Sequence, residues 1–381
     1  MDIQTLRESF PITKSKVFLN HAGQSPLPTP VLNAMRRHLE EFSVTGSYAV
    51  DLGEVRGAFA RLIHAKPEEI ALVPNTSTGL NIAANALEYP PGSNVVTTDL
   101  EFPSVVYPWL RRRLGVEVRY VQNVEGRIPL DEFERAVDDR TVAVAISHVE
   151  YANGFRNNLR ELARIAHEHG AYLIVDVIQS AGAIQIDVKR DGVDFATASC
   201  YKWLLGPDGA GFLYVRDELI EGIEPPLVGW TSVEPEVFET IDLWEIRRLR
   251  LSGTARRFEV GTLSMASFLG AAEAIRLLMG VGMERVEGRV LSLTDRLIEG
   301  LMELGLKLQT PVERELRSGI VNFLIRNPEG WVRRLRERGI IVSARARGVR
   351  VSPHFYNTEE EIDLLLDELR RGLRQSPGRA G

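Results

Sequence analysis

Short apolar runs alternate with helical patterns over residues 69–216, and this alternation limits the possible folds more than any other feature. The apolar, β-branched runs lie at 69–74, 94–98, 116–121, 141–147, 171–176, 193–199 and 211–215. Several are apolar on both faces, which is typical of strands in a covered, largely parallel sheet. Between them, Asn158 and Glu161 have the spacing of a capping box, and Gly170 ends the helical pattern that follows. The alternation predicts a seven-stranded, mostly parallel sheet in a doubly wound α/β domain.

The pattern changes after about residue 217. Long amphipathic helices and short strands follow, at 265–280, 283–305, 319–325, 348–353 and 358–374. They predict a smaller α+β domain at the C-terminal end of the chain. We place the large domain at 21–258 and assign 1–20 and 259–381 to the small domain.

Composition and charge exclude several classes of protein. The 381 residues are 44% hydrophobic and 26% charged, with a formal net charge of -6, so no general positive field attracts nucleic acid or an anionic membrane. The single cysteine, Cys200, excludes an intramolecular disulfide framework and suits a reducing compartment. The N-terminus has no apolar core of signal-peptide length, and no run approaches ~18 consecutive apolar residues. We therefore expect a soluble, cytoplasmic protein that binds neither nucleic acid nor membranes.

Asp176 ends the apolar strand 171–176. Its carboxylate is therefore expected at the carboxyl edge of the sheet, where open α/β folds bind their ligands. A buried carboxylate is unfavourable unless a cation or hydrogen bonds compensate it. The alternative is that Asp176 caps the helix of the next βα connection.

Lys202 follows another apolar strand and precedes a loop rich in glycine and proline. An isolated lysine in such a place is usually a solvated surface residue. Here its neighbours are Ser199, Cys200, Tyr201 and Trp203, none of which carries a charge. Apolar surroundings lower the pKa of a lysine, and the neutral amine is the form that attacks an aldehyde.

The segment PNTSTGLN at 74–81 joins a predicted strand to a predicted helix. Hydroxyl side chains and free backbone N–H groups at a helix N-terminus form an arrangement that binds phosphate. Ordinary capping by Asn75 or Thr76 is the alternative. The segment is not a Walker loop, and no G-x-G-x-x-G follows the first strand, so a nucleotide or dinucleotide role is weakly supported.

Taken together, the hydroxyl-rich turn, the aromatic residue after a strand, the strand-terminal Asp and the run Ser-x-Tyr-Lys resemble the class V aminotransferase family. That family of fold-type I enzymes includes cysteine desulfurases, selenocysteine lyases, kynureninases and isopenicillin N epimerase-like proteins. The resemblance extends from FLNHAGQSPLP (18–28) to RVSPHFYNTEEEID (350–363). It implies a fold-type I architecture, pyridoxal 5′-phosphate (PLP) as cofactor, and a homodimer with shared active sites.

The resemblance also implies roles for individual residues around the cofactor. Lys202 would carry PLP as a Schiff base and later move the proton at Cα, while Asp176 would pair with the pyridinium nitrogen. Gln179 would bond the phenolic oxygen of the ring, and Phe102 would stack on its face. The residues expected to hold phosphate are Thr76, Ser77, Ser199 and Tyr201, with Gly261 and Thr262 reaching the phosphate of the neighbouring subunit.

Arg350 aligns with the arginine that binds the substrate carboxylate in the family, where a planar guanidinium can grip a carboxylate with two hydrogen bonds. The alternative is an ordinary surface arginine on a strand. Arg345 is a second candidate, which Arg347 could replace. Asn20 and His21 are predicted to line the substrate pocket.

Histidine spacing gives no support to a metal site. His167 and His169 are two apart on a predicted helix and cannot share a face, and His148 and His354 are interpreted as structural. We therefore predict that the protein binds no metal.

The reaction stays open at the level of sequence. Desulfurases need a cysteine on a loop of the small domain, near SARARGVR here, and this segment has none. Family frequency favours an aminotransferase that interconverts an amino acid and a 2-oxo acid. The alternatives are a lyase of the selenocysteine or C–S type and an amino-acid epimerase. The full set of cofactor residues argues against a PLP-binding module without turnover, and the missing glycine fingerprint argues against a nicotinamide enzyme.

Overall fold

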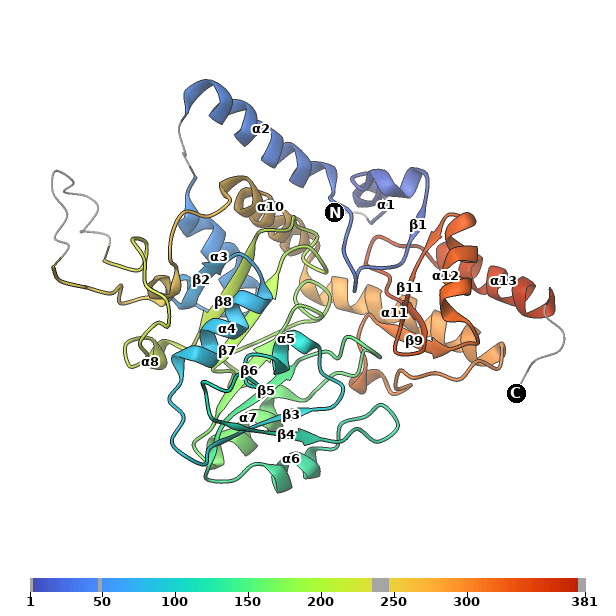
Figure 1. Cartoon of the computed structure of the whole chain (residues 1–381). Coiled ribbons are helices and arrows are strands. Elements are labelled where there is room, and N and C mark those ends of the chain that lie inside the picture. Colours follow the sequence, from blue (N-terminus) through green and yellow to red (C-terminus); the bar gives the residue numbers. More distant parts are fainter. Residues whose placement is uncertain (1–2, 47–49, 235–246, 376–381) are drawn as a thin grey trace.

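The computed structural model describes residues 3–46, 50–234 and 247–375, which form a large α/β part and a smaller part beside it (Figure 1). The large part is built on a seven-stranded sheet with the order β2-β8-β7-β6-β5-β3-β4. Its strands are β2 (Ile70–Val73), β3 (Asn94–Thr98), β4 (Glu117–Val121), β5 (Thr141–Ser147), β6 (Tyr172–Asp176), β7 (Phe195–Ser199) and β8 (Gly211–Val215). Only β8 runs antiparallel to its neighbours, β2 and β7, in this sheet. The predicted seven-stranded, mostly parallel sheet is confirmed.

Both faces of the sheet are covered. In β6, Leu173 and Val175 belong to one core cluster, whereas Ile174 between them belongs to another, and all three side chains are buried. This is why the strands are apolar at every position rather than at alternate ones. The helices of this part are α3 (Leu52–Leu62), α4 (Thr76–Ala86), α5 (Pro103–Val106), α6 (Leu130–Ala136), α7 (Leu159–Glu168), α8 (Asp217–Ile220) and α10 (Met265–Val281).

One predicted helix forms as expected, and another is shorter than expected. Helix α7 begins after Asn158, whose side chain accepts the backbone N–H of Glu161 at 3.3 Å, as predicted. Only half of the capping box forms, because the Glu161 carboxylate pairs with Arg164. The apolar pattern of SVVYPWLRRRLG, residues 104–115, predicts a helix, but helix α5 ends at Val106 and turns follow. Pro108 explains this correction, since it has no N–H to continue the helical hydrogen-bond ladder.

The smaller part combines a three-stranded antiparallel sheet with helices. Its strands follow the order β11-β12-β9, and a third core cluster packs beneath them. The bounds are β9 (Val321–Leu324), β11 (Ser343–Arg345), β12 (Gly348–Val351), α11 (Met283–Glu303), α12 (Pro328–Glu337) and α13 (Glu359–Gln375). Short 3-10 helices lie at Pro11–Lys14, Pro67–Glu69, Ala255–Phe258 and Arg314–Leu316. The expected α+β character of the C-terminal part is confirmed.

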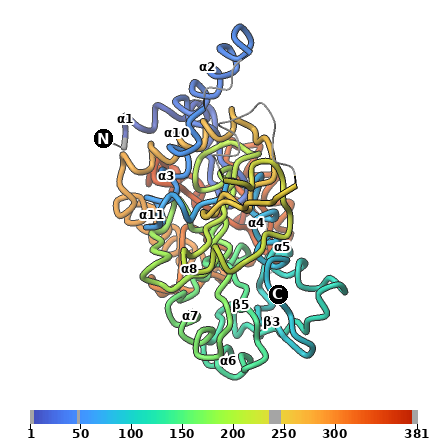
Figure 2. Tube along the Cα trace, turned by 90° about the vertical axis from the view of Figure 1, so that its left-hand side faces the viewer, coloured from blue at the N-terminus to red at the C-terminus, as the bar shows by residue number. Residues whose placement is uncertain are grey.

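The N-terminal segment joins the C-terminal part. Strand β1 (Val17–Phe18) pairs in parallel with β10 (Ile340–Ile341), after a short helix α1 (Ile3–Arg7). Helix α2 (Thr29–Thr45) then crosses towards the large part, and its C-terminal half projects beyond the rest of the chain in both views (Figure 2). The pairing of β1 with β10 agrees with grouping the first residues with the C-terminal part.

The hydrophobic packing passes from one core to the other inside α11. Val286 and Val290 belong to the core of the large sheet, whereas Leu293 and Leu297 belong to the core of the smaller part. Helix α10 packs on α2 and α3. Because α11 contributes to both cores, the packing gives no single boundary between the two parts, and the boundary placed at 258/259 stays a prediction.

No single described helix is both long and apolar enough to cross a membrane, although α10 and α11 together pass that test across an 81° bend. The sequence also predicts a loop at 224–244, which contains proline and tryptophan, and a terminal tail at 375–381. The loop lies partly outside the described residues, and the tail lies almost wholly outside them.

Candidate active site

A cavity of about 430 Å³ opens at the carboxyl edge of the large sheet. Strand register places this edge: Ser147 at the end of β5 is level with Asp176 at the end of β6, and Asp176 is level with Thr197 of β7. Eight residues predicted from the sequence line the cavity together: Thr76, Ser77, Phe102, Asp176, Gln179, Ser199, Tyr201 and Lys202. Open α/β sheets bind their ligands at this edge, because the loops that follow parallel strands meet there.

Lys202 lies three residues beyond β7 and is 9% exposed. Burial lowers its pKa to about 8; the carboxylate of Asp176 opposes this shift, and the charges of Arg350 and Arg345 add to it. Part of the Lys202 population is therefore a neutral amine near pH 8, and this amine is a nucleophile for an aldehyde. The surface alternative for Lys202 does not hold.

Asp176 faces the same cavity from the end of β6. Burial raises its pKa to about 6, although a hydrogen bond from the Ile178 N–H at 2.8 Å and the charge of Lys202 both favour the ionised form. At neutral pH the group is mainly a buried carboxylate, which gains from a cationic partner in the cavity.

The N-terminus of α4 forms the hydroxyl-rich side of the cavity. Asn75 caps the helix by accepting the Thr78 N–H at 2.9 Å, so the capping alternative is correct for this residue. Thr76 binds the Ser199 hydroxyl through its backbone N–H at 2.7 Å and its own hydroxyl at 2.8 Å. The hydroxyl groups beside a helix N-terminus make this side suited to phosphate.

Gln179 and Phe102 occupy the middle of the cavity. The Gln179 side-chain oxygen accepts the Trp203 indole N–H at 2.9 Å, and its nitrogen donates to the Ala22 carbonyl at 3.1 Å, which leaves one amide hydrogen for a ligand. The Phe102 ring meets Tyr151 edge to face, with ring centres 5.2 Å apart. Phe102 is 40% exposed, so part of its ring is open to a planar ligand.

Arg350 lies on β12, beyond the lining of this cavity, and is 2% exposed. Its Nη1 donates to the Tyr151 carbonyl at 2.8 Å, whereas its buried Nε has no partner. Burial, together with the charge of Arg345, lowers the Arg350 pKa to about 10. Within the described ranges no carboxylate pairs with this guanidinium. A buried unpaired cation is unfavourable, so the arrangement suits an anionic ligand.

Thr262, His21 and Asn20 also lie outside the cavity lining, as do Gly261 and Arg345. Thr262 is exposed, and the prediction that it reaches the phosphate of a neighbouring subunit stays a prediction. His21 is buried, with Nδ1 2.8 Å from the Ser352 carbonyl and Nε2 2.9 Å from the Tyr356 hydroxyl. These contacts favour a structural role for His21. The buried Asn20 Oδ1 has no hydrogen-bond partner among the described residues and is free to meet a ligand.

Sequence reasoning missed Ser147 and Glu101. The Ser147 hydroxyl, which lines the cavity, donates to the Glu101 carboxyl group at 2.8 Å, and the Phe102 N–H donates to the same group at 3.0 Å. Burial raises the pKa of Glu101 to about 8. This buried group therefore joins the loop that carries Phe102 to the end of β5. The position of Ser147 at a strand end was the signal that could have identified it.

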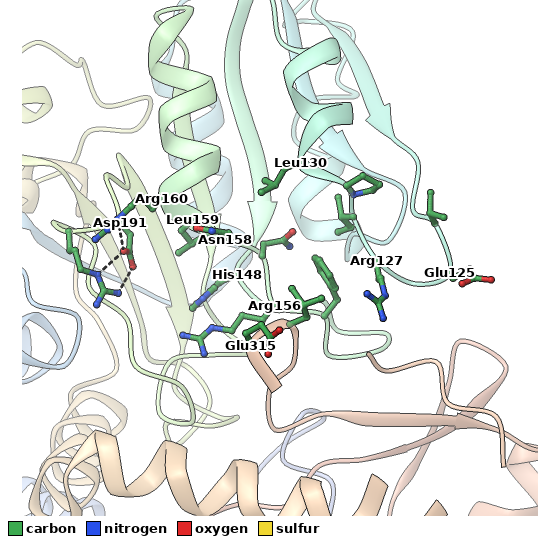
Figure 3. A pocket seen from close by; sticks show the side chains of 17 residues that line it. Glu125, Arg127, Leu130, His148, Arg156, Asn158, Leu159, Arg160, Asp191 and Glu315 are labelled. Carbon is green, nitrogen blue, oxygen red and sulfur yellow. Dashed lines mark hydrogen bonds and ion pairs between the residues drawn. The ribbon is translucent and has the colours of Figure 1, made fainter. Parts of the chain in front are cut away.

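A larger hollow, of about 800 Å³, lies elsewhere (Figure 3). Arg127, Arg156 and Asp191 are among its lining residues, and several of its charges are paired: Arg127 with Glu313, Arg156 with Glu287, and Arg190 with Asp191. Burial lowers the pKa of His148 there to about 3, so this ring is neutral. No lysine lines this hollow, so the smaller cavity, which contains Lys202, is the candidate active site. Over the described ranges, no three His, Cys, Asp or Glu side chains are placed to hold a metal ion.

The residues that line the cavity fit PLP chemically. It offers a buried amine for the aldehyde, a buried carboxylate for the ring nitrogen, an aromatic face for the ring and a hydroxyl-rich helix N-terminus for the phosphate. With the mostly parallel seven-stranded sheet and the smaller α+β part, these features define a fold-type I PLP-dependent enzyme.

Comparison with known proteins gives the family. Residues 17–365 match the family model described as aminotransferase class-V, and the chain belongs to this family. It is 32% identical to the uncharacterized aminotransferase YcbU of Bacillus subtilis, over 95% of this chain and 96% of the relative. The apo structure of cysteine desulfurase from Thermococcus onnurineus NA1 is similar with a TM-score of 0.89 and 29% identity, over 98% and 99% of the two chains. The cystine C-S lyase C-DES, solved with its reaction product cysteine persulfide, is similar with a TM-score of 0.86 and 25% identity, over 94% and 98%.

Proposed function

We propose that this PLP-dependent enzyme cleaves the Cβ–S bond of a sulfur-containing amino acid by β-elimination, without the help of a protein thiol. The observation that carries the proposal is the hairpin of β11 and β12, SARARGVRV, which contains no cysteine. The only cysteine of the chain, Cys200, is fully buried, and burial raises the pKa of its thiol, which keeps it protonated and unreactive. Transfer of sulfur to a protein cysteine is therefore disfavoured.

The similar proteins support elimination more than the transamination that family frequency favoured. One is a cysteine desulfurase and another a cystine C-S lyase, and both names describe cleavage of a carbon–sulfur bond. The lyase is solved with its reaction product cysteine persulfide, which is a small molecule and not a persulfide on a protein cysteine. Transamination is the second candidate, because the relative with 32% identity carries the name aminotransferase.

Three side chains would carry the reaction. PLP, when bound, supplies the electron sink for the bond-breaking steps at Cα. Arg350 would bind the α-carboxylate of the substrate and so fix which Cα bond faces Lys202. The neutral Lys202 amine would take the Cα proton, while Asp176 would hold a proton at the ring nitrogen. Loss of the Cα proton, together with departure of the sulfur substituent from Cβ as a thiolate that keeps the bonding electrons, leaves 2-aminoacrylate, which water converts to pyruvate and ammonia.

We also propose a homodimer. Helix α2 has one buried residue, Val31, and exposes Leu32, Leu39 and Val44. Phe102 beside the cavity is 40% exposed, although a residue that stacks on a cofactor is better shielded from water. A second copy would cover these apolar surfaces and bring its Thr262 to the phosphate side of the cavity.

The test is a product assay on the PLP-loaded enzyme. L-cysteine and L-cystine are supplied separately, and pyruvate, ammonia and sulfide or persulfide are measured with and without an added 2-oxo acid. Elimination predicts pyruvate and ammonia in equal amounts without a 2-oxo acid, and unchanged rates for Cys200→Ala. A requirement for a 2-oxo acid, with a new amino acid as product, would establish transamination instead. Loss of desulfurization in Cys200→Ala would contradict the thiol-independent route.

A further inference from the structure

The β11–β12 hairpin places two arginines on one face. Arg345 is paired with Gly348, and Ser343 is paired with Arg350, in an antiparallel register. Residues that are directly opposite each other in such a pair have side chains on the same face, as do residues two apart in one strand. Arg345 and Arg350 are therefore diagonal neighbours on one face of the hairpin, close enough that the charge of Arg345 lowers the pKa of Arg350.

The hairpin is held in a fixed and strained conformation. Its turn residues, Ala346 and Arg347, have φ values of +47° and +63°, in the left-handed region that disfavours residues other than glycine. Side-chain amides hold the turn, since Asn322 donates to the Arg345 carbonyl at 3.1 Å and Gln309 donates to the Ala346 carbonyl at 2.8 Å. Strain that surrounding contacts maintain is common at ligand sites.

Gly348 allows the hairpin to pack closely against strand β9. A Cβ atom at this position would lie 2.1 Å from Oδ1 of Asn322 and 2.5 Å from the Phe323 carbonyl oxygen. The fully buried Asn322 also donates to the Ala152 carbonyl at 2.7 Å, which ties the hairpin to the loop after β5. The position of Arg345 is thus set by the large part of the chain, on which the cavity lies.

Both arginines lack an acidic partner. Neither Arg345 nor Arg350 forms an ion pair with an Asp or Glu in the part of the chain that the structure describes. Arg345 donates only to the adjacent Ala344 carbonyl, at 2.8 Å, and its side chain is exposed. The hydrogen bond of Arg350 to the Tyr151 carbonyl leaves its charge uncompensated.

Tyr151 links the hairpin to the cavity. It lines the cavity, and its backbone carbonyl accepts the hydrogen bond from Arg350, which lies diagonally across the hairpin from Arg345. The charges of both arginines also lower the pKa of Lys202, which agrees with this placement. Many other arginines of the chain are paired with carboxylates, for example Arg289 with Glu359 and Arg296 with Asp363. Two adjacent unpaired guanidinium groups repel each other, and an anionic group on each would remove this repulsion.

We propose that the substrate is a dicarboxylic amino acid, with its α-carboxylate on Arg350 and its side-chain carboxylate on Arg345. This inference rests on the role proposed above for Arg350 and adds the class of side chain that the site accepts. For the proposed elimination, the substrate is a cysteine derivative with a carboxylate beyond its sulfur atom. Arg345 then decides specificity, and monocarboxylic amino acids leave its charge unmatched.

The test uses binding of unreactive acids, so that it does not depend on the reaction. Glutarate and butyrate have nearly the same length and differ by one carboxylate. Isothermal titration of the PLP-loaded enzyme should show glutarate binding at least about tenfold more tightly than butyrate, as expected for one additional charged contact. Arg345→Gln should reduce this preference to within about twofold and leave butyrate affinity nearly unchanged, while Arg345→Lys should retain part of it.

Arg347→Gln is the matched control, because it removes the same charge two residues further along the hairpin. It should keep the preference for glutarate. Equal affinity of the wild-type protein for the two acids would overturn the inference, and so would an equal loss in Arg345→Gln and Arg347→Gln.

Arg350→Gln separates this inference from the proposed function. It should weaken both acids. If it weakens neither, the role of Arg350 in the proposed function is wrong, and the inference falls with it. If it weakens both while Arg345→Gln changes nothing, the proposed function stands and only the second carboxylate contact is wrong. The product assay with L-cysteine reports elimination independently of Arg345.

Discussion

The Nζ atom of Lys202 lies 5.8 Å from the centre of the Phe102 ring and the same distance from the centre of the Tyr201 ring. Phe102 follows β3, whereas the other two residues follow β7, so the contact joins two strands that are not neighbours in the sheet. A planar ring stacked on Phe102 therefore has an amine within reach. The low exposure of Lys202 keeps this amine partly neutral at mildly alkaline pH.

Replacement of Lys202 tests its catalytic role. Lys202→Ala removes the amine that takes the Cα proton, so kcat should fall by at least about 10³-fold, with PLP still bound non-covalently. The exposed Lys307 provides a control, and Lys307→Ala should keep the wild-type rate. Steady-state kinetics and the visible spectrum of each variant measure these effects. A Lys202→Ala enzyme with more than a tenth of the wild-type rate would remove Lys202 from the mechanism.

The pH dependence of PLP capture tests the lowered pKa of Lys202. Only the neutral amine attacks the aldehyde, so the rate of capture by the PLP-free enzyme should rise up to about pH 8 and then level off. Arg350→Gln removes a charge that lowers this pKa, and the midpoint should move to higher pH. Stopped-flow absorbance measures the rate. A capture rate that keeps rising up to pH 10, without levelling off near pH 8, would mean that Lys202 has the pKa of a solvated lysine.

Asp176→Asn tests how much the buried carboxylate of Asp176 lowers the free energy of unfolding. The pKa of Asp176 is raised from 3.8 to about 6, so the folded protein binds this proton more readily than the unfolded chain does. Its contribution to stability is therefore lost as the pH rises from about 4 to about 6. At pH 7 the PLP-free Asn variant should be more stable by about 1–3 kcal/mol, and this difference should shrink at pH 4.5. Urea unfolding at both pH values measures it.

The same variant should lose activity. Asparagine cannot hold a cationic ring nitrogen, so kcat should fall by about 10²-fold or more even though the PLP-free protein is more stable. Activity and stability would thus change in opposite directions. A variant with full activity would exclude Asp176 as the partner of the ring nitrogen.

Arg350→Gln should act mainly on substrate binding. The guanidinium is buried without an anionic partner, so its loss should raise KM for the amino acid by about 10²-fold and change kcat less. Arg347→Gln, in the same hairpin, should leave KM within about twofold of wild type. Similar KM values for the two variants would contradict the assignment of Arg350 to the α-carboxylate.

The sequence predicts the large sheet well, because strands covered on both faces have a distinct pattern. Leu173, Ile174 and Val175 are consecutive apolar residues that pack alternately into two cores. The same reasoning identified Asp176 and Lys202, since both follow such strands. It failed at residues 104–115, where Pro108 should have outweighed the apolar pattern. The change of core inside α11 has no sequence signal, because both cores accept the same apolar side chains.

Long-range polar contacts account for the parts of the site that the sequence does not predict. Glu101 bonds Ser147, which is 46 residues away, and only the order of strands in the sheet makes them neighbours. The two ring nitrogens of His21 are hydrogen-bonded to Ser352 and Tyr356, which come from the other end of the chain. The placement of Arg345 and Arg350 as diagonal neighbours on one face of the hairpin depends on a turn of two left-handed residues that are not glycine, which sequence rules disfavour.

The most direct test of the active-site assignment is to identify the residue to which PLP is covalently attached. The purified enzyme is loaded with PLP and reduced with borohydride, and the labelled peptide is then identified by mass spectrometry. We expect a pyridoxyl group on Lys202, in the peptide that contains ASCYKWLLG, and no label in the Lys202→Ala variant. A label on another lysine, or no label on a protein that remains active, would contradict it.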